Sequence, residues 1–127
     1  MPSDTNTPTV LVVEDEWLVR CTLLDFLRAS DLGVVEAPSG EAAVEILQQR
    51  DGIDIVFTDI RLGGSVNGWD VGEVARATHP DIPVIYTSGA VISPSRPVAG
   101  SLFFDKPYDP KKILSACREL HRNKQVS

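Results

Sequence analysis

Four short segments of the sequence carry residue types that suit the transfer of a phosphoryl group. Glu14 and Asp15 directly follow one apolar run, Asp59 ends another, a hydroxyl pair at 87–88 follows a third, and Lys106 follows a fourth. Carboxylates are hard oxygen ligands that suit Mg²⁺, and a carboxylate can also be a covalent acceptor. A metal ion and a lysine together neutralise charge on phosphoryl oxygens. This chemistry requires all of these groups to meet at one place.

Each segment has a simpler explanation when it is considered alone. An Asp at the end of a strand usually caps a turn, which would account for Asp59. Asp15 could be the N-cap of a following helix, although three consecutive acids at 14–16 exceed what one cap requires. Crowded carboxylates repel one another unless a cation lies among them. The elements that carry these residues decide between capping and a shared site.

Short apolar runs alternate with segments of helical periodicity along the chain, and turn-forming residues separate them. The expected strands cover residues 9–13, 33–37, 53–59, 82–87 and 101–104. The expected helices cover about 16–30, 39–51 and 69–79, and a last helix begins at Pro110 with Asp109 as its N-cap. The alternation predicts an α/β fold, a doubly wound five-stranded parallel sheet with helices on both faces.

Parallel strands place their carboxyl ends at one edge of the sheet, where open α/β sheets bind their ligands. That edge would gather Glu14, Asp15, Asp59, a hydroxyl from 87–88 and Lys106. Core packing explains none of these residues. Their convergence outweighs the capping explanations and predicts a phosphoryl-transfer site.

Composition and charge limit the class of protein. The chain has 127 residues, of which 43% are hydrophobic and 24% charged, as in one soluble globular domain. The net charge of −6 argues against a nucleic-acid surface. No apolar stretch reaches membrane-spanning length, and the polar start is unlike a signal peptide. Cys21 and Cys117 are expected to be reduced, core-packed thiols of a cytoplasmic protein, and His79 a solvated surface residue.

The ordered set of motifs resembles the receiver domain of two-component response regulators, from Thr9 to about Leu120. The likeness rests on Glu14-Asp15, Asp59, the switch hydroxyl and Lys106-Pro107, each after a different strand. Each motif is weak alone, but the set in this order is highly specific. The resemblance implies a flavodoxin-like sheet with strand order 2-1-3-4-5.

The resemblance also implies a chemistry for the acids. Asp59 would accept a phosphoryl group from a phosphohistidine on a histidine kinase or a histidine phosphotransfer protein. Asp15 and Asp59 would bind Mg²⁺ directly, Arg61 would bind it through its backbone carbonyl, and Glu14 would bind it through water.

Further roles follow from the same resemblance. Lys106 would contact the phosphoryl group, and the Lys106–Pro107 peptide bond would be cis. The switch hydroxyl lies five residues after the proline that begins the fourth strand in this family. Counting from Pro83 selects Ser88 rather than Thr87, and Ser88 would move to bond the phosphoryl group. Phe103 matches the aromatic switch position.

The chain departs from the usual receiver pattern after the third and fourth strands. Gly63 stands where the loop after Asp59 usually has a proline, and this loop carries one extra residue before Gly68. The interval between the switch hydroxyl and the lysine is several residues shorter than in most receivers. Because Pro94 and Pro97 lie within it, residues 90–100 are expected to form an irregular, mobile loop that largely replaces the fourth helix.

The expected domain covers residues 9–122, between a disordered tail at 1–8 and a second tail at 123–127. No output domain follows Asn123, so we expect a stand-alone receiver that signals to an unknown downstream protein by protein–protein contact, without nucleic acid or membrane.

Three other classes of protein fit the sequence less well. A Mg²⁺-dependent aspartyl-phosphate phosphohydrolase needs a second Asp two residues after the nucleophile, where this chain has Arg61. A flavodoxin-like cofactor binder needs a phosphate loop after the first strand, where the acids at 14–16 would repel phosphate. A degenerate receiver should have lost an acid or the lysine. The expected protein is therefore not an enzyme beyond slow autodephosphorylation.

Overall fold

A computed structural model defines residues 7–90 and 94–126 of the chain, which form five strands and four helices. The strands are β1 (Thr9–Val13), β2 (Gly33–Ala37), β3 (Ile55–Asp59), β4 (Val84–Ser88) and β5 (Leu102–Asp105). The helices are α1 (Trp17–Ala29), α2 (Gly40–Gln49), α3 (Gly68–Thr78) and α4 (Pro110–Val126). In this part of the chain, no helix is both long enough and apolar enough to cross a membrane.

The strands form one parallel sheet in the order β2-β1-β3-β4-β5. This confirms the predicted doubly wound fold and its strand order. The order reverses between β1 and β3, so the loops after these strands diverge and leave an open crevice at their carboxyl ends.

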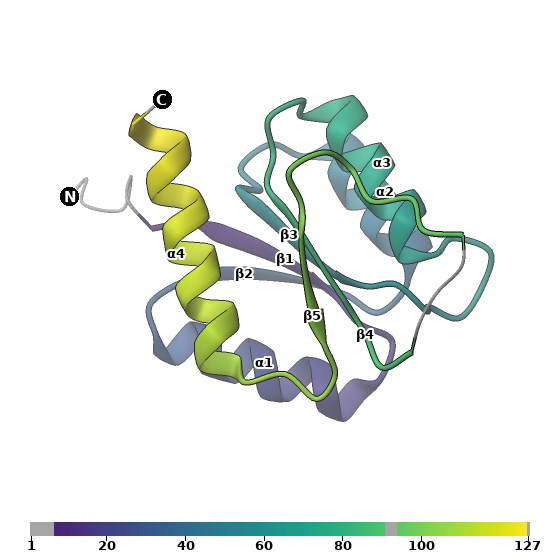
Figure 1. Cartoon of the computed structure of the whole chain (residues 1–127), viewed down its shortest axis with the longest axis horizontal. Helices are drawn as coiled ribbons and strands as arrows, with labels where there is room; N and C mark the ends of the chain where they lie inside the picture. Colours follow the sequence, from purple (N-terminus) through teal and green to yellow (C-terminus); the bar gives the residue numbers. More distant parts are fainter. Residues whose placement is uncertain (1–6, 91–93, 127) are drawn as a thin grey trace.

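The alternation of side chains along each strand builds a core on either face of the sheet. Val10 and Val12 pack in a cluster with side chains of α1 and α4. Leu11 and Val13 point the other way, into a cluster with side chains of α2 and α3. Figure 1 shows these two pairs of helices on opposite sides of the sheet. Both faces are covered, which explains why β1 and β3 are continuous apolar runs.

Local hydrogen bonds set the starts of three helices. The Ser39 hydroxyl accepts from the backbone N–H of Ala42 and caps α2. Asn67 and Asp70 form a reciprocal capping box at the start of α3. At the start of α4, Asp109 precedes Pro110 as predicted, and its Oδ1 accepts from the backbone N–H of Lys111 at 2.9 Å. Each cap pairs backbone donors that have no partner inside a helix.

The connection between β4 and β5 contains no helix within its described residues, 89–90 and 94–101. Arg96 instead fastens it to α3, with ion pairs of 2.9 Å to Asp70 and 3.2 Å to Glu73. The backbone N–H of Val98 also donates to the Tyr86 hydroxyl at 3.1 Å. Residues 91–93 lie outside the described residues, and the mobility of the loop stays a prediction.

The predicted tails differ from the observed ends of the fold. The last helix runs to Val126, so the expected boundary at 122 falls inside a helix. The polar end of a helix has no apolar periodicity in the sequence, but its backbone hydrogen bonds can still continue the helix. Residues 1–6 of the expected first tail lie outside the described residues, whereas the carbonyl of Pro8 accepts from the backbone N–H of Gly33.

Three side chains singled out from the sequence occupy different environments. Cys117 is fully buried as predicted, and burial raises the pKa of its thiol to about 12. Cys21 is only half-buried, because Leu23, Leu24 and Leu27 hold the inner face of α1. The expectation that His79 is solvated is wrong: the residue is half-buried, and its Nε2 is enclosed without a partner in the described residues.

The close approach of Gly68 to the backbone at the end of β3 gives a first prediction. A Cβ on Gly68 would collide with the carbonyl oxygen of Asp59 and lie 2.6 Å from the Cα of Ile60. Gly68→Ala should therefore lower the free energy of unfolding by about 1–3 kcal/mol in urea denaturation, because the backbone beside Asp59 must move. Gly63→Ala is the matched control, since its nearest neighbour would lie at 3.5 Å. Equal stabilities for the two variants would contradict the prediction.

Candidate functional site

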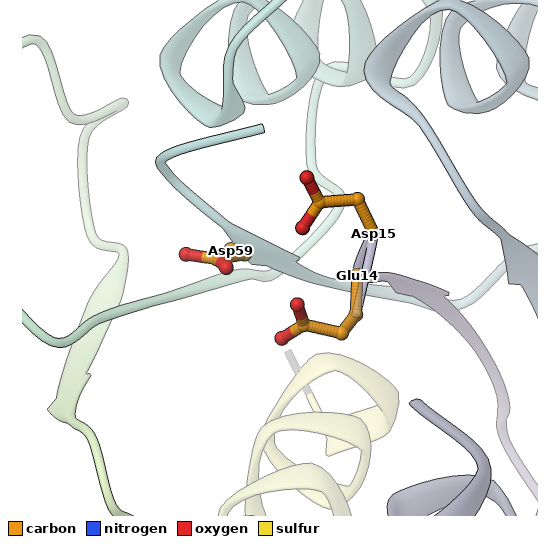
Figure 2. A group of neighbouring side chains, drawn as sticks. All are labelled: Glu14, Asp15 and Asp59. Atoms are coloured by element: carbon orange, nitrogen blue, oxygen red, sulfur yellow. The ribbon is translucent and has the colours of Figure 1, made fainter. Parts of the chain in front are cut away.

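The ends of β1 and β3 bring three carboxylates together. Glu14 and Asp15 directly follow β1, and Asp59 is the last residue of β3. Each offers a carboxylate oxygen, and these three atoms all lie within 4.8 Å of one another. Figure 2 shows the side chains gathered around one small space. Glu14 and Asp59 are buried, at 1% and 5% exposure, whereas Asp15 is exposed.

Lys106, which follows β5, supplies the positive charge of the cluster. Its Nζ lies 2.8 Å from Oε1 of Glu14 and 2.9 Å from Oδ2 of Asp59. Burial disfavours the ammonium, but the hydrogen bonds to these two carboxylates outweigh burial and raise the pKa of Lys106. The Lys106–Pro107 peptide bond is cis, as predicted.

Burial shifts the pKa of the Glu14 carboxyl group in the opposite direction. It raises the pKa of Glu14, and the nearby charge of Asp59 raises it further. The hydrogen bond from Lys106 opposes both effects without overcoming them. Three carboxyl groups thus share one lysine ammonium at this site.

The structure corrects the capping explanation for Asp15. Its Oδ2 accepts from the backbone N–H of Gly63 at 3.0 Å, across the crevice. Glu16 occupies the N-cap position of α1, and its side chain makes no capping bond. Asp59 does make a turn contact, because its Oδ1 accepts from the backbone N–H of Arg61 at 3.3 Å, but its second oxygen faces Lys106.

The donor set fits a hard divalent cation. It consists of carboxylate oxygens from three side chains, two of them buried, around one shared space. Such oxygens are the ligands that Mg²⁺ prefers, and a cation would relieve their mutual repulsion. A hollow of about 510 Å³, lined by Asp15, Asp59, Arg61, Ser88 and Lys106 among others, leads to this space.

The hydrogen bonds of the two candidate hydroxyls distinguish them. Thr87 donates to the carbonyl of Phe104 at 2.8 Å and so ties β4 to β5. Ser88 instead bonds within the following loop: it donates to the carbonyl of Ala90 at 3.0 Å and accepts from the same residue's N–H at 3.2 Å. Ser88 also lines the hollow beside Asp59. Among the described contacts, Thr87 is structural and Ser88 is the hydroxyl that faces the site.

Phe103 lies apart from the acids, on β5, where it is paired with Tyr86 of β4. Its side chain is 48% exposed, which is high for a large apolar residue. A second hollow, of about 450 Å³, separates it from the site and is lined by Phe103, Trp69, Ser88 and Ala90 among others. The structure therefore leaves space between Phe103 and Ser88.

Sequence reasoning missed the side chains that shape the loops of the site. Glu41 accepts from both the N–H and the hydroxyl of Ser65 at 3.0 Å and so holds the glycine-rich loop after β3. Arg20 donates to the carbonyl of Glu14 at 2.8 Å and holds the turn after β1. Both residues are charged side chains on helices, and no periodicity in the sequence predicts which groups they bond.

Comparison with known proteins identifies the class of this arrangement. Residues 10–118 match the family model for the response regulator receiver domain. The chain belongs to this family, whose members are signalling domains of two-component systems.

Individual relatives agree with the family. The chain is 32% identical over 120 residues to the sensor kinase CckA of Brucella abortus, covering 91% of this chain and 13% of that protein. It is 25% identical to the transcriptional regulatory protein BaeR of Escherichia coli, covering 96% of this chain and 51% of that one. The chain thus spans about half the length of BaeR and a small part of CckA.

A solved structure supports the same fold. A response regulator receiver protein from Sinorhizobium medicae superposes with a TM-score of 0.86 at 30% identity, over 91% of this chain and 95% of the other.

The lysine-centred cluster generates a second prediction. Lys106→Met should lower the free energy of unfolding by about 1–3 kcal/mol in metal-free buffer, because it leaves buried carboxylates without their cation. The loss should shrink by at least about 0.5 kcal/mol in a Glu14→Gln background, since one of those carboxylates is then neutral. Urea denaturation of the four proteins measures this coupling. Lys112→Met, on the exposed face of α4, is the control, and strictly additive effects would refute the coupling.

Proposed function

We propose that the protein is a phosphoacceptor in two-component signalling or a phosphorelay, and that Asp59 is the phosphorylation site. The observation that carries the proposal is the placement of Asp59 between a lysine ammonium and two further carboxylates at one open edge of the sheet. The donor is a phosphohistidine on a histidine kinase or a histidine phosphotransfer protein. The similarity to a sensor kinase supports this class of partner.

The transfer exchanges one bond at phosphorus for another. A carboxylate oxygen of Asp59 attacks the phosphorus atom, so that a P–O bond forms while the P–N bond to the imidazole breaks. The electron pair of the broken bond leaves on the imidazole nitrogen. Lys106, already 2.9 Å from Asp59, stays beside the acceptor and balances charge on the phosphoryl oxygens.

The acids would hold the metal ion that this chemistry needs. We assign Asp15 and Asp59 as direct ligands of Mg²⁺, with the backbone carbonyl of Arg61, and Glu14 as a ligand through water. The chemistry that Mg²⁺ supplies when bound is neutralisation of charge between the phosphoryl oxygens and the acceptor carboxylate.

The signal leaves the site through the loop after β4. Ser88 turns from Ala90 toward the phosphoryl group, which removes both of its bonds to the loop. Phe103 moves into the hollow beside Ser88 and changes the surface around β5. A downstream protein reads this surface, so that the output is a protein–protein contact in the cytoplasm, without nucleic acid or membrane.

The runner-up, a Mg²⁺-dependent aspartyl-phosphate phosphohydrolase, has less support. Its acid/base would have to stand at Arg61, two residues after the acceptor. A guanidinium does not release a proton at neutral pH, so it cannot activate water as a base. Loss of the phosphoryl group is then limited to slow autodephosphorylation.

Phosphorylation generates the third prediction. Treatment with acetyl phosphate and Mg²⁺ should add one phosphoryl group, seen by intact-protein mass spectrometry, because Asp59 is the acceptor. Asp59→Asn should abolish the addition, and chelation of Mg²⁺ should suppress it. Asp51→Asn, an exposed acid outside the site, is the matched control and should label like the parent. Full labelling of Asp59→Asn would rule out the assignment.

The metal ligands generate the fourth prediction. Asp15→Ala should weaken Mg²⁺ binding more than Glu14→Gln does, because loss of a direct ligand costs more than loss of a water-mediated one. Calorimetric titration with Mg²⁺ measures both affinities. The reverse order would show that Glu14 binds the ion directly.

A further inference from the structure

A hollow of about 410 Å³ opens at the end of the sheet opposite Asp59. The residue before β1, the turn after α1 and the second half of α4 surround it. Its lining includes Pro8, Ser30, Asp31, Arg118, His121 and Arg122. Figure 1 shows the start of β1 beside α4, away from the carboxyl ends of β1 and β3. Nothing in the proposed phosphotransfer uses this hollow.

A buried imidazole without partners marks the hollow as more than a gap in packing. His121 is 8% exposed, and neither Nδ1 nor Nε2 has a hydrogen-bond partner among the described residues. A neutral imidazole has one donor and one acceptor, and a charged one has two donors. Burying such groups unpaired is costly, so a polar group is expected to occupy the hollow beside them.

Two guanidinium groups accompany this imidazole. Residues at spacings of three and four share one face of a helix, so Arg118, His121 and Arg122 lie together on α4. Arg118 donates from Nη2 to the carbonyl of Ser30 at 2.9 Å and so caps the end of α1. Arg122 is exposed and has no partner among the described contacts. It is the cation available to a ligand.

The charge of the chain is distributed in favour of an anion here. The helix α4 carries five of the chain's 12 Lys and Arg residues but only one of its 18 acids. Asp31 is the one acid of the lining, and it holds a left-handed backbone with φ 69°. Its carboxylate and the negative end of α1 oppose an anion, but Arg118 already neutralises that helix end.

We propose that this hollow binds a small oxyanion, the phosphate or carboxylate group of a small molecule, between Arg122 and His121. The guanidinium matches the paired oxygens of either group, and the buried imidazole supplies the second donor. The site is separate from Asp59, and the inference stands independently of the proposed function.

The test is a titration with inorganic phosphate, and in parallel with acetate, followed through the ring ¹⁵N signals of the histidines by NMR. The unphosphorylated protein without Mg²⁺ is used, so no phosphotransfer enters the result. The ring signals of His121 should shift saturably, while those of His79, which lies outside this lining, stay fixed. Saturation by phosphate alone indicates a phosphate-bearing ligand, and saturation by acetate as well indicates that carboxylates are accepted.

Variants locate the effect. Arg122→Gln should weaken binding at least about tenfold, the usual worth of a hydrogen bond to a charged group. Asp31→Asn should tighten binding a few-fold, because it removes the opposing charge and asparagine tolerates the left-handed backbone. Lys112→Gln, on α4 but outside the lining, should leave affinity unchanged. Absence of a saturable shift with both anions, or equal losses in Arg122→Gln and Lys112→Gln, would overturn the proposal.

Discussion

The repulsion between carboxylates crowded at one end of the sheet is the constraint on which the site depends. Glu14 and Asp59 are both buried, where charge is poorly screened, and Lys106 bridges them from a third strand end. The parallel sheet delivers all three groups to the same edge. Lys106 offsets part of this repulsion. In the function that we propose, the remaining negative charge attracts a divalent cation, which in turn allows a phosphoryl group to bind.

The fold could be predicted because its signals are local and repeated. The apolar runs predicted β1 and β2 with the same first and last residues that the structure has. The strand order was predicted from the family resemblance, which rests on motifs such as Lys106-Pro107. The gathering of the acids and the lysine follows from strand ends, whereas the choice of Ser88 over Thr87 came from the family resemblance. In the structure Thr87 bonds to β5 and Ser88 bonds within the loop after β4. What could not be predicted lies in long-range polar contacts. The partner of Asp15 is the backbone N–H of Gly63, far along the chain, and no pattern in the sequence predicts this contact.

The described residues of the loop after β4 form no helix, and side-chain contacts hold them to α3 instead. Arg96 replaces helical packing with ion pairs to Asp70 and Glu73, all of them partly exposed. Exposed ion pairs contribute only about 0–1 kcal/mol each, far less than a buried apolar face. Apart from these ion pairs, the loop is also held by the hydrogen bond from Val98 to Tyr86. In the function that we propose, such a loop responds to the loss of the two hydrogen bonds of Ser88 more readily than a packed helix does. Under the proposed function, this connection favours signalling by rearrangement of a segment over displacement of a rigid element.

The two ends of β1, which are separated by the length of the strand, lie beside side chains of opposite charge. The carboxyl end of β1 leads into Glu14 and Asp15, while its amino end lies beside the basic half of α4, at Arg118 and Arg122. Charges this far apart across a protein interact weakly at physiological salt, because the screening length is about 8 Å. Each end can therefore hold the ligand that we propose for it, a cation at one and an anion at the other. If one end influences the other, the coupling must run through the packing of α1 and α4 against the sheet, since α1 begins at the acids and ends at the basic hollow.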